Sequence, residues 1–178
     1  MKRSLFILQA WLLGLAVVLA TPALAGDVQK HGGAFYIRLP ATIDFAQVVD
    51  RLQTEIQAKN WEVLKVQDVD KGLKDNYHVD VQNKVIYACK SQYLARAIKE
   101  DPNITLIVPC RFAVYRVDAS GKAVGGKPGK VGKIVVGISD PADEARHLGI
   151  KQMGAAKAAS KELQEVLQAV ADDYLRMK

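Results

Sequence analysis

Two segments of this chain carry apolar residues at helical spacing, and they constrain the fold more than any other feature of the sequence. The first begins at Thr42 or Asp44, either of which can cap a helix, and ends near Asn60. Its apolar side chains recur every three or four positions, at Phe45, Val48, Val49, Leu52 and Ile56. The second runs from about residue 155 to 176 and repeats the pattern at Leu163, Val166, Leu167, Val170 and Tyr174. Each helix therefore has one apolar face that must be buried against a second layer.

The segments between these helices have the two-residue alternation or the β-rich composition of strands. We expect five strands, over residues 34–39, 61–66, 85–89, 112–117 and 133–138. Shorter helices are predicted at 69–77, at 91–99 and after Asp140-Pro141. The Gly- and Lys-rich residues 118–132 have the composition of a hairpin loop. Together these elements predict a two-layer α+β domain, with a mostly antiparallel sheet and its helices on one face.

The first 25 residues have the three parts of a secretion signal. The basic pair Lys2 and Arg3 precedes an apolar stretch, Leu5–Ala20, and the small-residue motif Ala23-Leu24-Ala25. A membrane-spanning helix needs about 20 apolar residues, more than this stretch provides. We therefore expect cleavage after Ala25, no stable membrane anchor afterwards, and a periplasmic or secreted protein.

Cleavage would remove 25 of the 178 residues and leave 153, which suits one domain over residues 26–178. The formal net charge would fall from +6 to +4 with the loss of Lys2 and Arg3. The remaining positive charge is spread along the chain and forms no basic stripe, so a nucleic-acid partner is not expected. An anionic small molecule or an acidic protein partner is compatible with this charge.

Three stretches of the chain resemble the bacterial domain-of-unknown-function 302 family, over about residues 34–170. They are Thr42–Val69, Val85–Ala88 with Val108-Pro109, and Ser139–Pro141 with Arg146–Gly149, the last being the most specific. The resemblance implies a β-α-β4-α fold of the TATA-binding-protein-like type, often seen as a dimer. It implies no activity, because none is established for the family as a whole. One turn departs from the family pattern: relatives usually have Gly-Asn-Pro where this chain has Ala88-Cys89-Lys90.

The two cysteines lie at the end of one predicted strand, Cys89, and at the start of the next, Cys110. If these strands are antiparallel, as the family fold implies, their Cα atoms could approach the roughly 5.5–6 Å that a disulfide needs. Two cysteines in an exported protein usually oxidise, so we expect a structural disulfide. A redox-active pair is the alternative, because the positive charges of the flanking Lys90 and Arg111 could lower a thiol pKa.

No catalytic or metal-binding motif stands out in the sequence. Gly121–Pro128 nearly has the spacing of a phosphate-binding loop, but Pro128 stands where a Ser or Thr hydroxyl is needed. None of the three histidines has the spacing of a helical metal site, and no metal or cofactor is expected. His147 is the best polar candidate, because it lies in the stretch that most resembles the family. We expect it to line a ligand-binding rim with Asp68, Asp140 and Arg146.

These features favour a binding or accessory protein of the periplasm that performs no catalysis. It would hold a small ligand or a partner protein in a groove between sheet and helices, or at the interface of a homodimer. The less favoured alternative is an enzyme that performs thiol–disulfide exchange through Cys89 and Cys110. A third interpretation is a purely structural dimer module in a larger envelope complex.

Overall fold

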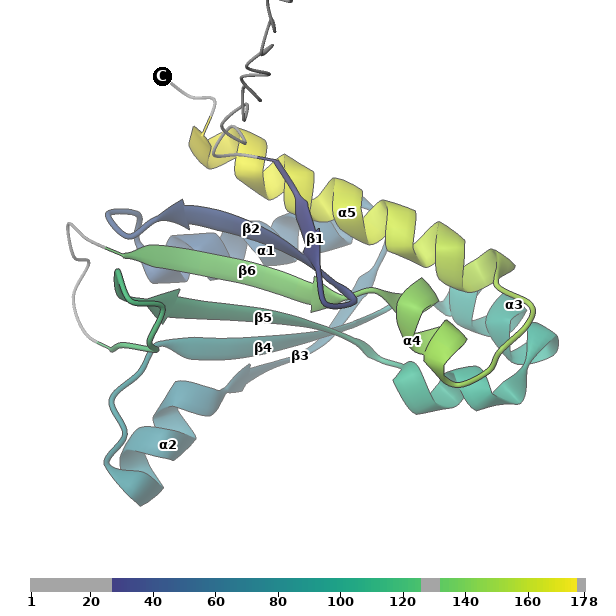
Figure 1. Ribbon diagram of the computed structural model, residues 1–178, viewed down its shortest axis with the longest axis horizontal. Coiled ribbons are helices and arrows are strands. Elements are labelled where there is room, and N and C mark those ends of the chain that lie inside the picture. The colour runs from purple at the N-terminus through teal and green to yellow at the C-terminus, as the bar shows by residue number, and fades with distance from the viewer. Residues whose placement is uncertain (1–26, 126–131, 176–178) are drawn as a thin grey trace, which may run out of the picture.

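Six strands form one sheet in the order β1-β2-β6-β5-β4-β3 (Figure 1). The computed structural model describes residues 27–125 and 132–175; the predicted signal peptide and residues 126–131 of the Gly- and Lys-rich loop lie outside these ranges. The strands are Gln29–His31 (β1), Ala34–Pro40 (β2), Glu62–Asp68 (β3), Asn83–Cys89 (β4), Cys110–Val117 (β5) and Lys133–Ser139 (β6). Every neighbouring pair is antiparallel, which confirms the predicted sheet. β1 was missed, because its three exposed residues show no alternation.

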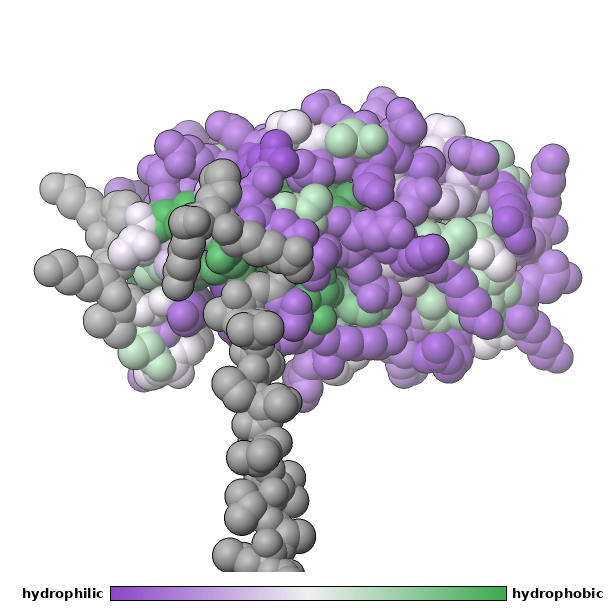
Figure 2. Space-filling model, turned by 90° about the horizontal axis from the view of Figure 1, so that it is seen from above, coloured by the Kyte–Doolittle hydropathy of each residue, from purple (hydrophilic) through white to green (hydrophobic). Residues whose placement is uncertain are grey.

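The two long helices, α1 (Phe45–Ala58) and α5 (Gly154–Leu175), cover one face of this sheet. In Figure 1, α1 lies behind the strands and α5 runs along their upper side. The predicted start of α1 is confirmed at Asp44, whose side chain accepts a hydrogen bond of 3.0 Å from the Gln47 backbone N–H. Apart from the part that grey atoms cover, the surface is mostly hydrophilic when the molecule is seen from above (Figure 2).

The shorter helices lie at the two ends of the strands rather than on the sheet face (Figure 1). They are α2 (Val69–Tyr77), α3 (Ser91–Glu100), the 3-10 helix η1 (Pro102–Ile107) and α4 (Pro141–His147). α2 projects from one end and has no buried residue. α3, η1 and α4 pack together at the other end. In residues 27–125 and 132–175, no helix is both long enough and apolar enough to cross a membrane.

The core lies between the sheet and the two long helices. Alternate residues of β2, β5 and β6 point towards these helices and are almost fully buried: Phe35, Ile37, Leu39, Phe112, Val114, Ile134, Val136 and Ile138. They meet the apolar faces that the sequence predicted for α1 and α5. The two-layer α+β architecture is therefore confirmed, and the opposite face of the sheet carries neither long helix.

One charged side chain, Arg116 of β5, is buried at the edge of this core with only 2% of its surface exposed. Its Nε donates a hydrogen bond to Gln82 Oε1 at 2.6 Å, and its Nη1 donates to the backbone oxygen of Ala41. Nη2 donates to the backbone oxygen of Ile43 at 3.3 Å. Burial lowers the pKa of Arg116, and the negative charge of Asp44 opposes this shift. The guanidinium therefore fastens the turn before α1 to the middle of the sheet.

Replacing this side chain with an apolar one of similar length should destabilise the domain strongly. Arg116→Met removes the donors and leaves the buried carbonyl of Ala41 without its partner, so we expect the free energy of unfolding to fall by about 2–4 kcal/mol. Urea denaturation followed by circular dichroism measures this change. The matched variant Arg96→Met, on the exposed surface of α3, should change it by less than about 0.5 kcal/mol. If the two substitutions lowered the free energy of unfolding equally, the anchoring role of Arg116 would be contradicted.

Candidate functional site

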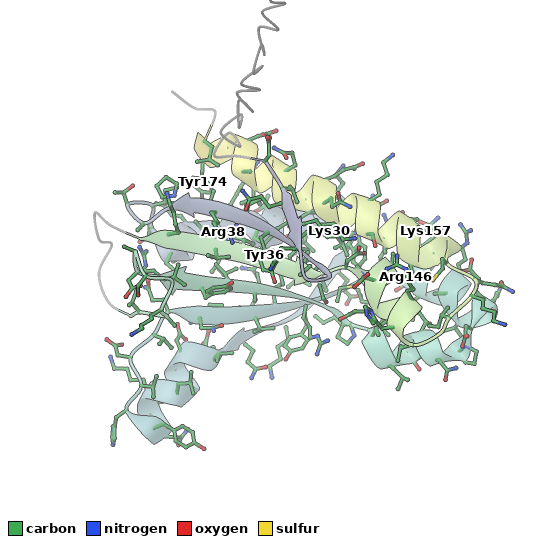
Figure 3. All side chains as sticks on the ribbon, viewed as in Figure 1. Lys30, Tyr36, Arg38, Arg146, Lys157 and Tyr174 are labelled. Carbon is green, nitrogen blue, oxygen red and sulfur yellow. The ribbon has the colours of Figure 1, made fainter. Side chains whose placement is uncertain are left out.

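Three of the four predicted rim residues lie on or beside α4. Asp140 is the residue that caps the helix, and Arg146 and His147 are in its last turn (Figure 3 labels Arg146). Arg146 Nη1 forms an ion pair with Asp143 of the same helix. His147 Nδ1 lies 2.8 Å from the backbone oxygen of Asp143. The Arg146 and His147 side chains are 62% and 76% exposed, so they belong to the outer surface of α4 rather than to an enclosed pocket.

The fourth predicted residue, Asp68, lies elsewhere. It ends β3 and forms an ion pair with Lys84 of β4, with 2.7 Å between Oδ1 and Nζ. The strand register places Asp68 three strands away from β6, roughly 14 Å across the sheet at about 4.8 Å per strand. The four side chains therefore do not meet at one rim, and their role in ligand binding stays a prediction.

Asp140 holds together three elements that are far apart in the sequence. Its side chain is only 3% exposed, and its Oδ2 lies 2.5 Å from Lys30 Nζ of β1. Its Oδ1 accepts hydrogen bonds from the Ala142 backbone N–H at 2.9 Å and from the Ser160 hydroxyl of α5. Burial alone would raise the pKa of this carboxyl, but the hydrogen bonds from Lys30, Ser160 and Ala142 outweigh burial and lower it. The group is therefore an ionised anchor for α4.

This anchor predicts a loss of stability in acid. Because the folded-state pKa of Asp140 is lowered, its contribution is complete above the unfolded value of about 3.9 and is lost as the pH falls through the folded value. Asp140→Asn should lower the free energy of unfolding by about 1–2 kcal/mol at pH 7 and should reduce its fall between pH 5 and pH 2. Urea denaturation at several pH values measures both, with Asp75→Asn on the exposed α2 as control. Parallel pH curves for the wild type and Asp140→Asn would refute this role.

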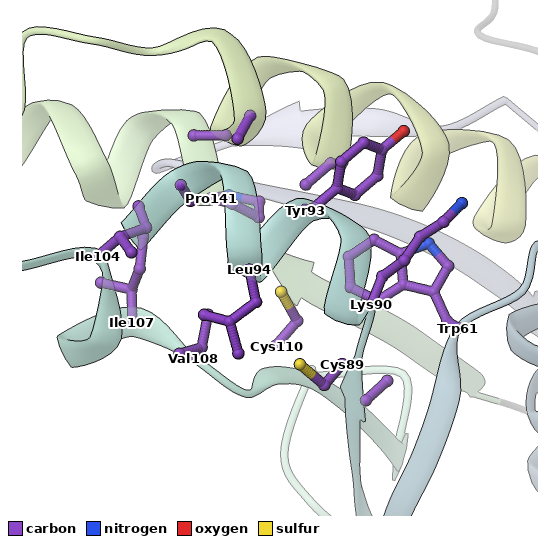
Figure 4. A pocket seen from close by; sticks show the side chains of 15 residues that line it. Trp61, Cys89, Lys90, Tyr93, Leu94, Ile104, Ile107, Val108, Cys110 and Pro141 are labelled. Atoms are coloured by element: carbon purple, nitrogen blue, oxygen red, sulfur yellow. The ribbon is translucent and has the colours of Figure 1, made fainter. Parts of the chain in front are cut away.

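The two cysteines line one small apolar cavity beneath α3 (Figure 4). The register places Cys110 opposite Ala88, so Cys89 lies one residue further along β4 at the same end of the sheet. Both residues are free thiols in the structure, and Cys110 is buried with 8% of its surface exposed. The cavity measures about 40 Å³. Its walls carry no carboxylate and no imidazole among the described residues. The predicted disulfide between these cysteines stays a prediction.

At both thiols, the effect of burial on the pKa outweighs the opposing effects that lower it. Burial raises the pKa of Cys89, and the charge of Glu62 adds to the shift. Burial also raises the pKa of Cys110 to about 12, with contributions from Glu144 and from Cys89, against an opposing effect of Arg111. Neither group therefore has the low thiol pKa that is typical of a redox nucleophile.

Lys90 is directed at a carboxylate instead of at the sulfurs. Its Nζ lies 2.7 Å from Glu162 Oε2 of α5 and 5.0 Å from the centre of the Tyr93 ring. Glu162 also accepts hydrogen bonds from Trp61 Nε1 at 2.9 Å and from the Tyr93 hydroxyl at 2.6 Å. Burial alone would raise the pKa of Glu162, but these three donors lower it. We call Trp61, Lys90, Tyr93 and Glu162 the Glu162 cluster; it ties the ends of two strands and α3 to α5 beside the cysteine cavity.

The sheet face opposite α1 and α5 offers a larger candidate site. One cross-strand row on this face runs through Tyr36, Gly137, Ala113 and Val85. A hollow of about 320 Å³ lies over this row and is lined by Ala34, Tyr36, Arg111, Ala113, Tyr115, Gly137, Ile138, Ser139 and Glu144. Tyr36 and Arg38 stand on the face turned to the viewer in Figure 3. We call this depression the open-face hollow.

Small residues make the floor of the open-face hollow, and tyrosines rise beside it. A Cβ atom at Gly137 would lie 2.7 Å from Cδ1 of Tyr36, so the Tyr36 ring can pack against β6 only because residue 137 is glycine. Burial raises the pKa of Tyr115, with Tyr36 adding to the shift and Arg38 opposing it. These three side chains are therefore close neighbours on one face. The charged side chains that line the hollow are Arg111 and Glu144 of α4, which lie 3.8 Å apart.

The open-face hollow cannot be predicted from the sequence, because β6 lacks the alternation of apolar and polar residues that would distinguish its two faces. Residues 134–138 are all buried, although Val135 and Gly137 point away from the helices. Val135 is only 4% exposed. A strand that is apolar on both faces does not show which side is covered by helices. Within residues 27–125 and 132–175, no group of three or more His, Cys, Asp or Glu side chains could hold a metal ion.

Known proteins show which family this architecture comes from. A crystal structure of an uncharacterized conserved protein DUF302 from Bacillus stearothermophilus superposes with a TM-score of 0.61 and 16% sequence identity. The match covers 81% of this chain and 99% of that chain, and at this identity it shows the fold alone. No curated protein matches the sequence. The family described as domain of unknown function DUF302 matches residues 37–170, which is most of the chain. The chain therefore belongs to the DUF302 family, as its sequence motifs predicted.

Proposed function

We propose that this domain is a non-catalytic binding module that holds a small planar anion in the open-face hollow. The observation that carries the proposal is a hollow of about 320 Å³ on a sheet face that neither long helix covers, with two tyrosines above a floor of Gly137 and Ala113. Aromatic side chains bind flat ligands by stacking or edge contact. The small side chains of Ala34 and Ala113 leave room for such a ligand to lie beside the Tyr36 ring, which itself covers Gly137.

Arg111 supports the anionic character of this ligand. Its side chain is 55% exposed at one end of the open-face hollow. The 3.8 Å that separate it from Glu144 are longer than a hydrogen bond, so the guanidinium can turn to a ligand. A planar guanidinium binds carboxylate or phosphate groups through two parallel hydrogen bonds. The neighbouring Arg38 adds positive charge on the same face.

The proposed place of action is the periplasm, after removal of residues 1–25. The basic pair, the apolar stretch and the Ala23-Leu24-Ala25 motif support this location. In that oxidising compartment, Cys89 and Cys110 are proposed to form a structural disulfide, because they line one cavity at neighbouring strand ends. The redox-enzyme alternative is less well supported, since the pKa of each thiol is raised.

Binding can be tested with naphthalene-2-sulfonate, a planar aromatic anion, and with neutral 2-naphthol. Tyr36→Ala should weaken both probes about tenfold, because it removes an aromatic wall. Arg111→Ala should weaken only the sulfonate, again by about tenfold. NMR titration of backbone amides measures the affinities, and the shifts should centre on Gly137 and Ala113. Tyr77→Ala, a change to an exposed tyrosine of α2, is the matched control.

Several results would count against this site. Probes that shift amides on α2 or α5 instead of β5 and β6 would show that the hollow is not where they bind. Equal affinities for the wild type and both variants would do the same. A homodimer that buries the open face would make probe binding weaken as the protein concentration rises, and light scattering would then report a doubled mass.

The proposed disulfide has its own test. The protein purified from the periplasm of its host, without reductant, should show no thiol that reacts with Ellman's reagent after unfolding, and two after reduction. Cys89→Ser should lower the free energy of unfolding by about 3 kcal/mol relative to the oxidised wild type. Two reactive thiols in the unreduced protein would end the structural interpretation.

A further inference from the structure

The cysteine cavity is separate from the open-face hollow and shares no lining residue with it. Two thiol groups line this small cavity. β4 ends at Cys89 and β5 begins at Cys110, so the strand ends deliver two thiols to one space. Figure 4 shows both sulfur atoms directed into the space below α3. The negative charge that Cys89 would carry raises the pKa of Cys110, as expected for two groups close together.

The size of the cavity restricts what it can contain. About 40 Å³ is far below the roughly 150 Å³ of a cavity that admits benzene. The occupant is therefore a single ion or a few atoms rather than an organic ligand. Among the described residues that line it, only the two sulfurs can bear a negative charge near neutral pH on binding a metal. Leu94, Ile107 and Val108 contribute apolar walls.

These donors select a class of metal. Thiolates favour soft cations, whereas Mg²⁺ and Ca²⁺ require oxygen ligands. Zn²⁺ usually takes four ligands, and the cavity offers two with no carboxylate or imidazole on its described walls. Soft d¹⁰ monovalent cations are satisfied by two thiolates in a linear arrangement. The apolar walls keep water from the metal, which also hinders its oxidation.

We propose that Cys89 and Cys110, when both are reduced, form a two-coordinate site for a soft monovalent cation such as Cu⁺. The two S–H bonds break, two S–Cu bonds form, and two protons are released to solvent without any change of oxidation state. The resulting complex has a charge of −1; the positive charge of Arg111 favours an anion at Cys110, and the negative charge of Glu144 opposes it. A disulfide would consume both donors, so oxidation of the pair must release the metal.

Anaerobic titration of the reduced protein with Cu⁺, in competition with bicinchoninate, tests the site. We expect one Cu⁺ per chain, release of two protons, and a thiolate-to-copper charge-transfer band in the near ultraviolet. Bound Cu⁺ should protect both thiols from Ellman's reagent. Protein oxidised with diamide, which takes the two thiol hydrogens as the S–S bond forms, should bind no metal, and Zn²⁺ should not displace Cu⁺.

Variants separate this site from adventitious binding by sulfur. Cys89→Ser and Cys110→Ser should each weaken Cu⁺ binding about 100-fold or more, while Met153→Leu, which removes a nearby thioether, should leave it unchanged. Circular dichroism verifies that each variant is folded; the proton count and thiol protection in the wild type test the site even if Cys110→Ser unfolds. One Cu⁺ shared by two chains, or equal affinity in the wild type and Cys89→Ser, would overturn the proposal.

Discussion

The burial of one sheet face by α1 and α5 is the constraint on which the rest of the molecule depends. It commits every second residue of β2, β5 and β6 to the core, for example Ile37, Val114 and Val136. The residues between them must then point to the opposite side, which neither α1 nor α5 covers. Tyr36, Ala113 and Tyr115 are placed there by register alone. The open-face hollow is therefore a direct result of how the core is made.

Polar side chains hold the covering elements in position at three points. Arg116 fastens the turn before α1, Asp140 joins β1 and α4 to α5, and the Glu162 cluster joins the strand ends to α5. Each lies at a junction where backbone or side-chain polar groups would otherwise be buried without partners. The Glu162 cluster also borders the cysteine cavity, so the position of α3 above the two sulfurs depends on it.

The parts of this structure that could be predicted from sequence are those set by local periodicity. The three- and four-residue spacing identified α1 and α5, and Asp44 was recognised as a cap from its type and place. The partners of Glu162 could not be found in this way. Trp61 is 101 positions away, and nothing in the residues around it indicates that it contacts Glu162. The predicted rim failed to assemble for the same reason. Asp68 is distant from α4 because β5 and β4 lie between β6 and β3 in the sheet. The residue pattern of a single strand does not show this order.

The strand order also has a consequence for how this chain reaches its native state. β2, near the start of the domain, pairs along its whole length with β6, so that Ala34 lies opposite Ser139. The centre of the sheet can therefore not close until the last third of the chain has been synthesised, and α5 must follow before the core is sealed from water. Contacts between such distant segments form slowly. Closure of the central strand pair is therefore a late step in the assembly of this sheet.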